Sequence, residues 1–281
     1  LSVAGDTGTT QDPLPFIHSL AQNQNAFVGN AVVPIYGGMT SCSEFEFLTS
    51  FSLAFGNASS APLTQYIHQQ TPSLAWQFSQ LGYQTSASHP ATGSNWDRAK
   101  AYPLLGFDET VFLDGYQSAN YIRGLVSDAS NYDELIKRFE QNRQTPQFMF
   151  NLTIQNHGGY EVPGYTPTTQ ITGSQGQFPQ AEQYFTLMRE SDAAFENFIA
   201  YFKQVDEPVI VVMFGDHWGA SEEEYTETLF GKPLSSLTES ENLLRYQTPL
   251  VIWSNFAMDF SMVPQTTSLN DTGCLIKSIA G

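Results

Sequence analysis

Short apolar runs alternate along the chain with segments in which apolar residues recur at helical spacing. The runs at 209–214 and 248–253 are continuous and rich in β-branched residues, which is typical of strands buried on both faces. In the segment 72–81, Leu74 and Phe78 lie on one helical face, and Gly82 marks the end of the pattern. We therefore predict helices at 13–21, 72–81, 132–141 and 181–202, and strands at 31–35, 83–88, 148–154, 209–214 and 248–253.

Helices that alternate with buried strands indicate an α/β fold with a mostly parallel central sheet and helices on both of its faces. The 281 residues contain no linker, internal repeat or low-complexity segment, so we predict a single domain over 1–281. Residues 165–180 are rich in Thr, Gly, Gln and Pro, and we expect a long surface loop near a functional site there.

Acidic residues strongly outnumber basic ones: 28 Asp and Glu oppose 11 Lys and Arg, and the net charge is −17. This charge makes nucleic acid a poor partner, because the phosphate backbone would be repelled. The longest apolar runs are far shorter than the roughly 20 residues that a membrane-spanning helix needs. Leu1 is not an initiator methionine, and no signal-like apolar segment follows it, so we expect the chain to be part of a longer protein.

The two cysteines, Cys42 and Cys274, are too few for a metal-binding cluster. Their wide separation in the sequence leaves open whether they meet in the fold. We interpret both as small buried side chains that fill the core.

Polar side chains follow three of the predicted strands where each strand ends. They are Ser88 and His89, then Gln155, Asn156 and His157, and finally Asp216 and His217. Open α/β sheets build their sites at the carboxyl ends of parallel strands, so we expect these side chains to converge.

Asp216 and His217 offer one hard oxygen and one nitrogen ligand to a divalent metal. The alternative is a capping aspartate beside a hydrogen-bonded histidine. The remaining histidines, His18 and His68, fall in or beside helical stretches, and we expect them at the surface or in packing contacts.

A glycine turn leads directly into the predicted start of another helix. Gly37 and Gly38 free the backbone for a tight turn, and Thr40 or Ser41, with Glu44 downstream, has the pattern of a helix N-terminus. An N-cap role, which contributes about 1 kcal/mol to helix stability, is one interpretation. The other is a nucleophile, because the free amide groups of a helix N-terminus favour the negative charge of a phosphate.

Five short motifs occur along the chain in a fixed order. They are Gly37-Gly38-Met39-Thr40-Ser41-Cys42-Ser43-Glu44-Phe45-Glu46, His89 with Asn95-Trp96-Asp97-Arg98, Tyr102-Pro103 with Gly106-Phe107-Asp108, Gln155-Asn156-His157, and Gly215-Asp216-His217. In these motifs the chain resembles, over nearly its whole length, the extracellular domain of the lipoteichoic acid synthase family. That resemblance implies a sulfatase-like fold of the alkaline phosphatase superfamily.

The resemblance implies an enzyme that moves glycerol phosphate from phosphatidylglycerol to a polyglycerolphosphate chain, with Mn²⁺ or Mg²⁺ as cofactor. Thr40 would be the nucleophile and a metal ligand, and Asp216 and His217 would be the other metal ligands. The residues implied to surround the phosphoglycerol head group are His89, Trp96, Arg98 and His157. The full-length protein would work on the extracellular face of a bacterial cell membrane, anchored by an N-terminal region absent from this chain.

These roles agree with the chemistry of the side chains. A divalent ion would lower the pKa of the Thr40 hydroxyl and so activate it. Arg98 has a planar fork that can take two phosphate oxygens, and Trp96 offers a flat wall for glycerol. His157 can protonate the departing alkoxide and later deprotonate the acceptor alcohol, and His89 fits either binding or proton transfer. The alternatives are a surface arginine beside a packed tryptophan, and histidines held by hydrogen bonds at strand ends.

The chain departs from the family pattern in two places. The family carries an acidic metal ligand in a Glu-Ser-Phe type segment at the end of its first strand, and this chain starts after that point. We therefore expect the first strand to be missing and only three protein ligands to remain for the metal. Neither Asp6 nor Asp12 has a spacing that makes it a substitute. Asn95 and Asp97 also stand where family members often carry an aromatic residue and an asparagine.

The predicted reaction has two steps and passes through a glycerophosphoryl group on Thr40. One alternative is another superfamily enzyme: a phosphodiesterase, a phosphoethanolamine transferase or a sulfatase. The sulfatase pattern Cys/Ser-X-Pro-X-Arg is not met, because Glu44 and Glu46 stand where Pro and Arg would follow Cys42. A second alternative is a non-catalytic module that binds a glycerophosphate polymer.

Overall fold

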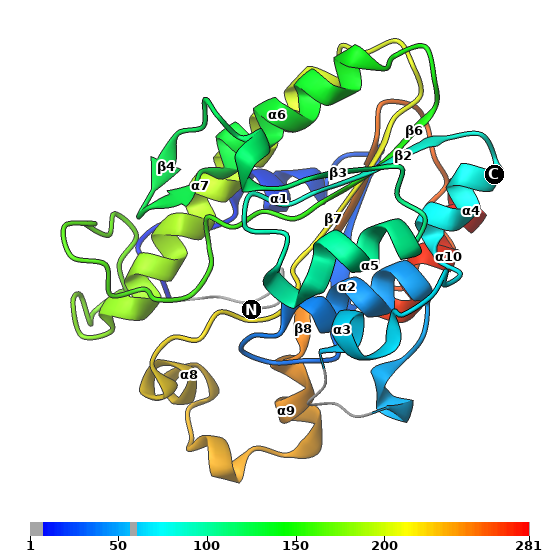
Figure 1. Cartoon of the computed structure of the whole chain (residues 1–281). Coiled ribbons are helices and arrows are strands. Elements are labelled where there is room, and N and C mark those ends of the chain that lie inside the picture. The colour runs from blue at the N-terminus through cyan, green and yellow to red at the C-terminus, as the bar shows by residue number, and fades with distance from the viewer. Residues whose placement is uncertain (1–7, 57–60, 281) are drawn as a thin grey trace. The chain divides into compact units, whose positions relative to one another are not determined.

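The computed structural model describes residues 8–56 and 61–280 (Figure 1). Asp6, weighed above as a metal ligand, and the start of the chain, where the first strand is expected to be missing, lie outside the described residues. The chain forms two compact units: residues 1–38 with 156–267, and residues 39–155 with 268–281. A single catalytic domain over 1–281 stays a prediction.

The first unit contains a four-stranded sheet. Its elements are α1 (Pro15–Leu20), β1 (Ala26–Val32), α7 (Pro179–Phe202), β7 (Ile210–Phe214), α8 (Glu223–Phe230), η4 (Leu234–Ser236), α9 (Glu239–Leu244), β8 (Gln247–Ser254) and β9 (Thr266–Ser268). The strand order is β7-β8-β1-β9. β8 runs antiparallel to both neighbours, and Trp253 lies opposite Val211 on one side and Ala26 on the other. Residues 250–253 of β8 are almost completely buried, and because successive side chains point to opposite faces of a sheet, both faces of this strand are covered.

The second unit contains a parallel three-stranded sheet. Its elements are α2 (Thr40–Thr49), η1 (Leu53–Phe55), α3 (Pro62–Tyr66), α4 (Leu74–Gln80), β2 (Gln84–Ser88), η2 (Asn95–Asp97), α5 (Arg98–Leu104), β3 (Glu109–Val111), η3 (Leu113–Gly115), β4 (Tyr121–Ile122), β5 (Leu125–Val126), α6 (Asp128–Gln141), β6 (Gln147–Asn151) and α10 (Leu269–Ala280). β2 lies between β3 and β6 and is parallel to both.

Aromatic side chains join this sheet to its helices. Phe148 and Phe150 are two residues apart on β6, so both face the same side of the sheet. Phe148 stacks on Phe78 of α4 with ring centroids 4.6 Å apart, and Phe150 stacks on Phe47 of α2 at 5.9 Å. Figure 1 shows α6 on the other side of these strands. The second unit is thus the helix-covered parallel sheet that the apolar runs predicted.

The α/β class is confirmed, but the mostly parallel sheet is found only in the second unit. In the first unit β8 pairs antiparallel with β1 and β7. The reason is that a continuous apolar run identifies a buried strand without giving its direction, which depends on how the chain returns to the sheet.

Most predicted elements are found close to their predicted limits, and the strands predicted at 83–88, 209–214 and 248–253 are β2, β7 and β8 to within one residue at each end. The helices predicted at 72–81, 132–141 and 181–202 are α4, α6 and α7. The strand predicted at 31–35 is wrong in position, because β1 begins at Ala26 and includes Gly29. A Cβ at Gly29 would lie 2.6 Å from the backbone oxygen of Gln265, so a glycine that suggests a turn serves close strand contact here.

The loop predicted at 165–180 is only partly a surface loop. Thr169 and Ile171 are buried, and the Glu182 carboxylate accepts a hydrogen bond from the Ile171 amide at 3.1 Å. Residue Thr9 forms an isolated antiparallel bridge with Ile171. These contacts hold the loop against the start of α7.

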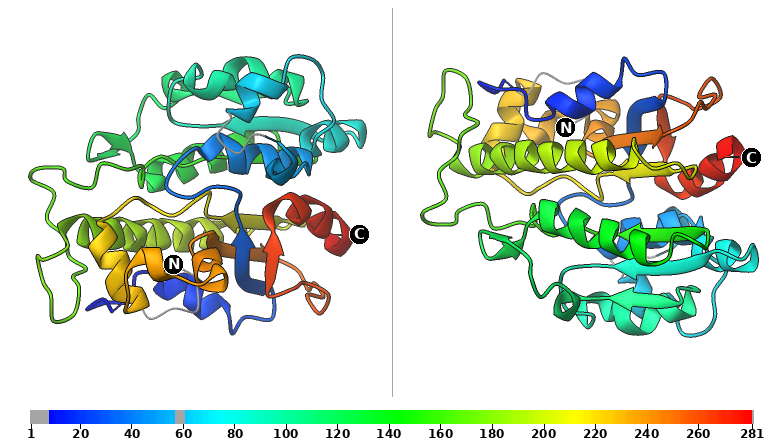
Figure 2. Two further views of the ribbon diagram at one scale, coloured as in Figure 1. Left: turned by 90° about the horizontal axis from the view of Figure 1, so that it is seen from below. Right: turned by 90° about the horizontal axis from the view of Figure 1, so that it is seen from above.

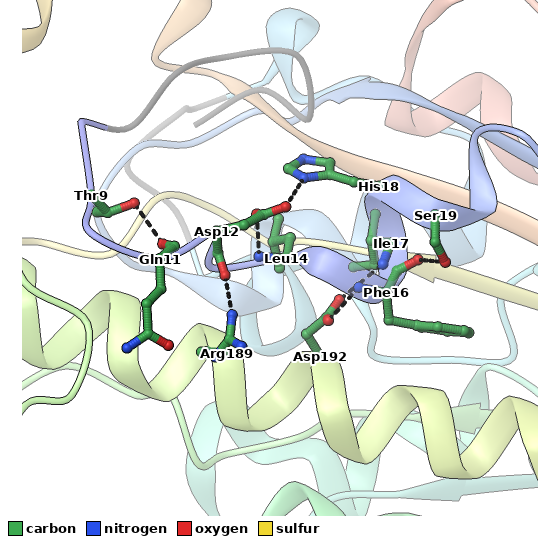
Figure 3. A network of polar contacts seen from close by, with 10 residues as sticks. All are labelled: Thr9, Gln11, Asp12, Leu14, Phe16, Ile17, His18, Ser19, Arg189 and Asp192. Atoms are coloured by element: carbon green, nitrogen blue, oxygen red, sulfur yellow. Dashed lines mark hydrogen bonds and ion pairs between the residues drawn. The ribbon is translucent and has the colours of Figure 1, made fainter.

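A polar network connects α1 to α7 (Figure 3). Asp192 of α7 accepts hydrogen bonds from the backbone amides of Phe16 at 2.7 Å and Ile17 at 3.0 Å. The N-cap residue of α1 is Leu14, which has no side-chain oxygen to offer. Asp192 therefore supplies from another helix the acceptor that a local N-cap would supply. The right-hand view of Figure 2 shows α1 (blue) beside α7 (yellow-green).

Replacement of Asp192 by Ala is expected to lower the free energy of unfolding by about 2–3 kcal/mol, because two buried amides lose a charged acceptor. Asp12→Ala is the matched control. The Asp12 carboxylate is 42% exposed, accepts from the Leu14 amide at 2.9 Å and pairs with His18 at 2.7 Å. Its loss should cost less than about 1 kcal/mol. Urea unfolding followed by circular dichroism measures both, and equal losses would contradict the assignment.

Candidate active site

Thr40 is the first residue of α2 and follows a turn of left-handed backbone. Gly37 and Gly38 have φ values of 75° and 154°, and Met39 has a φ of 63°. Met39, and not Thr40, is the N-cap residue, and it makes no side-chain hydrogen bond to the helix. Thr40 is partly exposed, whereas Ser41 is completely buried. The start of α2 therefore presents the Thr40 hydroxyl and hides the neighbouring one.

His89 directly follows β2 and is almost completely buried, with 4% of its surface exposed. Its backbone amide donates to the Val111 carbonyl at 2.9 Å. The Ser88 hydroxyl donates to Asn151 Oδ1 at 2.7 Å, which ties the ends of β2 and β6 together. His89 thus lies at the carboxyl end of the parallel strands, as predicted, and its contact with a substrate stays a prediction.

Trp96 lies in a strained turn between β2 and α5. Trp96 and Asp97 have φ values of 55° and 53°, a conformation that residues other than glycine rarely adopt. Such backbone costs of the order of 1–3 kcal/mol per residue and persists only where surrounding contacts hold it. Trp96 keeps part of its side chain exposed. A partly exposed tryptophan on a strained turn suits a role in ligand contact.

Arg98 follows this turn and is buried in an ion pair, with 2% of its side chain exposed. Its Nε lies 3.1 Å from both carboxylate oxygens of Glu44, and its Nη2 donates to Glu44 Oε1 at 2.5 Å. The Tyr102 hydroxyl donates to Glu44 Oε2 at 2.5 Å. Burial by itself would lower the pKa of Arg98, but the Glu44 carboxylate outweighs it and raises that pKa. The guanidinium stays charged and its fork is turned toward Glu44.

The Glu44 cluster, defined as Glu44, Arg98 and Tyr102, unites three of the sequence motifs. Glu44 is on the helix that begins at Thr40, and Arg98 and Tyr102 are on α5, which begins directly after Trp96. The cluster therefore holds the Thr40 helix and the Trp96 turn in one arrangement. Sequence reasoning missed this role of Glu44 and Tyr102, although both stand in the quoted motifs.

Asp216 and His217 follow β7 after Gly215. A Cβ at Gly215 would lie 2.9 Å from the Thr248 side chain, so only glycine lets the chain leave the sheet at this point. His217 Nε2 lies 3.0 Å from Asp216 Oδ2, and His217 Nδ1 lies 2.7 Å from the Trp218 carbonyl. Burial would lower the pKa of His217, but the adjacent Asp216 carboxylate outweighs it and raises that pKa.

This pair fits two ligand positions of a divalent metal. Ligand atoms about 2.1 Å from a metal and at right angles lie about 3.0 Å apart. Asp216 Oδ2 and His217 Nε2 have that separation. With Nδ1 donating to the Trp218 carbonyl, Nε2 is the nitrogen available to a metal. In the part of the chain that the structure describes, no three His, Cys, Asp or Glu side chains gather as a metal site.

His157 lies on an exposed turn well after the end of β6. The strand predicted at 148–154 ends at Asn151, which leaves His157 farther from the sheet than expected. The residue before it, Asn156, donates through Nδ2 to the Ser191 hydroxyl at 2.9 Å. The structure thus places His157 on an exposed, anchored turn, and its role in proton transfer stays a prediction.

The predicted site residues divide between the two compact units. Thr40, His89, Trp96 and Arg98 belong to the second unit, and His157, Asp216 and His217 belong to the first.

His18 and His68 have the predicted surface positions. The two cysteines do not form a disulfide with each other; the interpretation as a buried filler is right for Cys42 and wrong for Cys274, which is exposed. Burial raises the pKa of Cys42 to about 11, so it remains a thiol.

Together, the fold and these side chains define an α/β protein with its candidate chemistry at strand and helix ends. The family model named Sulfatase matches residues 4–272. The chain therefore belongs to the sulfatase family.

A relative by sequence is a Rhizobium meliloti protein named for the modification of cyclic β-1,2-glucan. It is 34% identical over 255 residues, which cover 88% of this chain and 38% of the relative. The chain thus spans well under half of that relative's length.

Solved structures share the fold at low sequence identity. The phosphoglycerol transferase GacH of Streptococcus pyogenes, in complex with sn-glycerol-1-phosphate, matches 96% of this chain and 69% of its own with a TM-score of 0.79 and 22% identity. The lipoteichoic acid synthase LtaP of Listeria monocytogenes matches 95% of this chain and 65% of its own, with a TM-score of 0.76 and 17% identity. The C-terminal periplasmic domain of EcEptC of Escherichia coli, in complex with Zn, matches 97% of this chain and 76% of its own. Its TM-score is 0.64 and its sequence identity is 14%. The resemblance to the lipoteichoic acid synthase fold is confirmed.

Among the described residues, no helix combines the length and the apolar character required to cross a bilayer. This agrees with the short apolar runs of the sequence.

Glu44→Gln is expected to lower the free energy of unfolding by about 3–5 kcal/mol, because it leaves the Arg98 charge buried without a partner. Glu140→Gln is the control, since Glu140 forms a surface pair with Arg143 at 3.4 Å and its loss should cost about 0.5 kcal/mol. The double variant Glu44→Gln/Arg98→Met should recover part of the loss. Urea unfolding measures all three, and a double variant less stable than Glu44→Gln would contradict the explanation.

Asp216→Ala and His217→Ala should each weaken Mn²⁺ binding at least tenfold, because each removes one of two adjacent ligand atoms. His68→Ala, which changes an exposed histidine, is the control. Isothermal titration with Mn²⁺ measures the affinities. Dissociation constants within twofold of the unmodified chain would remove this pair from the metal site.

Proposed function

We propose that this chain is the catalytic part of a metal-dependent phosphoglycerol transferase. The observation that carries the proposal is the position of Thr40, a partly exposed hydroxyl at the first residue of a buried helix in a sulfatase-family chain. The fold shared with a phosphoglycerol transferase that binds sn-glycerol-1-phosphate supports the same class of substrate. The donor would be phosphatidylglycerol, whose phosphodiester carries the group to be moved.

The reaction has two displacements at phosphorus. Thr40 Oγ gives its proton to water and forms a bond to phosphorus as the bond to the diacylglycerol oxygen breaks. His157 gives a proton to the departing oxygen. In the second displacement His157 takes the proton of an acceptor hydroxyl, whose oxygen forms a bond to phosphorus as the bond to Thr40 Oγ breaks, and Thr40 Oγ takes a proton back from water. The N-terminal amides of α2 favour the negative charge that develops at Thr40 in both steps.

Asp216 and His217 would hold the divalent ion, with Thr40 as a further ligand. Bound there, Mn²⁺ or Mg²⁺ would lower the pKa of the hydroxyl and neutralise phosphate charge. A superfamily structure with Zn supports metal dependence and leaves the choice of metal to experiment.

In this proposal, Trp96, Arg98 and His89 bind the phosphoglycerol head group. Arg98 Nε and Nη2 face Glu44, and Nη1 makes only a long contact of 3.4 Å with the Asn95 carbonyl. Nη1 is therefore the group through which Arg98 would reach one phosphate oxygen. The flat face of Trp96 would lie against the glycerol carbons.

The acceptor would be a hydroxyl of a glucan. The sequence relative named for cyclic β-1,2-glucan modification supports this acceptor at 34% identity. The polyglycerolphosphate chain of lipoteichoic acid synthesis is the second candidate, supported by the fold shared with LtaP. We place the reaction on the outer side of the cell membrane, where the lipid donor would be reached through parts of the protein beyond this chain.

Incubation with phosphatidylglycerol and Mn²⁺ should add one glycerophosphoryl group to the chain, measured by intact mass. Thr40→Ala should abolish this adduct, because no other accessible hydroxyl begins α2. Ser41→Ala is the matched control and should keep it, since Ser41 is completely buried.

Addition of cyclic β-1,2-glucan or of polyglycerolphosphate should then discharge the adduct, and the faster acceptor identifies the product. Adduct formation with phosphatidylethanolamine in place of phosphatidylglycerol would indicate a phosphoethanolamine transferase. The absence of any adduct in a chain that binds Mn²⁺ would favour a non-catalytic binding module.

A further inference from the structure

Three aromatic side chains and one arginine gather in the first unit. Tyr36 lies between Trp218 and Tyr246, with ring centroids 6.1 Å and 6.3 Å away. The Arg245 guanidinium carbon lies 4.1 Å from the centre of the Tyr36 ring, in cation–π contact. We call Tyr36, Trp218, Arg245 and Tyr246 the aromatic platform. All four are partly exposed.

The sheet holds the platform in place. The Trp218 indole N–H donates to the Gln247 carbonyl of β8 at 2.7 Å, and the Val33 amide donates to the Tyr246 carbonyl at 2.9 Å. The residue after Trp218 is Gly219, where a Cβ would lie 2.6 Å from the Tyr160 hydroxyl. The hydrogen bond of the indole N–H and the close packing at Gly219 thus hold Trp218 in place.

The platform keeps polar groups that the protein itself does not use. Arg245 Nη1 donates to Asn242 Oδ1 at 3.0 Å, and Arg245 Nε is a buried donor without an acceptor among the described residues. The Tyr36 and Tyr246 hydroxyls make no hydrogen bond to any described residue. Fixed apolar ring faces with unused donors beside them are the usual composition of a small-ligand site.

The platform is close in sequence to both segments proposed to carry the chemistry. Trp218 directly follows the Asp216-His217 pair, and Tyr36 directly precedes the glycine turn that leads to Thr40. The platform residues therefore adjoin, in the sequence, both segments that carry the proposed chemistry.

We propose that the aromatic platform binds a sugar ring of the acceptor, an inference that rests on the proposed phosphoglycerol transfer. A hexose ring has a flat face of C–H groups that packs on an aromatic ring, and hydroxyls at its edge that pair with Tyr and Arg donors. A polyglycerolphosphate chain has no such face and is a polyanion. The platform holds one cation, and the chain carries a net charge of −17, so a neutral sugar fits better.

Binding of a neutral β-1,2-glucan oligosaccharide to the whole chain tests the proposal by isothermal titration. Tyr246→Ala and Trp218→Ala should each weaken binding at least tenfold, whereas Tyr246→Phe, which keeps the ring, should weaken it by no more than about threefold. Tyr121→Ala removes a tyrosine that is 55% exposed elsewhere, and it should bind as the unmodified chain does. Thermal unfolding of each variant checks that the fold is retained.

In acceptor kinetics, Tyr246→Ala should raise KM for the glucan by a larger factor than it lowers kcat, because the ring holds the acceptor and does not touch the phosphorus. No glucan binding, or equal binding by all variants, would overturn the subsite. Binding of polyglycerolphosphate with the same dependence on Tyr246 would also overturn it, in favour of a phosphate polymer.

The subsite and the reaction can fail separately. Glucan binding that depends on the platform, in a chain that never forms a glycerophosphoryl adduct, would support the subsite and reject the transferase. Glucan-dependent discharge of the adduct at equal KM in Tyr246→Ala and the unmodified chain would reject the subsite and keep the transferase.

Discussion

The buried ion pair between Glu44 and Arg98 is the constraint on which the candidate site of the second unit depends. Two charges with almost no exposure are tolerated only because Arg98 donates to both carboxylate oxygens and Tyr102 completes the shell. Their geometry fixes α2 against α5. The helix that starts at Thr40 and the turn that carries Trp96 therefore keep one relative arrangement, which a hydrophobic contact alone would specify less strictly.

The first unit uses close backbone packing where the second uses a buried charge pair. Gly215 lies against Thr248, and the Thr248 hydroxyl donates to the Gly215 carbonyl at 2.8 Å. This contact sets the point at which the chain leaves β7, and with it the position of Asp216 and His217. The same chain segment continues into Trp218 of the aromatic platform. The proposed metal ligands and the proposed acceptor surface thus follow one strand end, so the acceptor surface could change without altering the residues proposed to hold the metal.

Membership of the sulfatase family and the shared fold define a scaffold, and the site has to define the reaction. A phosphoglycerol transferase and a lipoteichoic acid synthase share the scaffold at identities of 22% and 17%. The proposed assignment accordingly depends on Thr40, on the Asp216-His217 pair and on the platform. Of these, only the platform would distinguish one acceptor from another, because the first two are proposed to act on the phosphate that all such substrates contain.

The sequence by itself determined the α/β class, the main helices and the segments in which the candidate chemistry lies. Apolar spacing is a local property, and it sufficed to place α4, α6 and α7. Motif order singled out Thr40, His89, Trp96, Arg98, His157, Asp216 and His217 as candidates, and their roles stay predictions. Only the tertiary structure decided the direction of β8, because strand direction depends on long-range chain return. It alone also paired Arg98 with Glu44, 54 residues apart, and Tyr36 with Arg245. The local sequence pattern does not predict such contacts, because they join segments that are far apart in the sequence. Burial of a charge beside its partner arises only when folding brings those segments together.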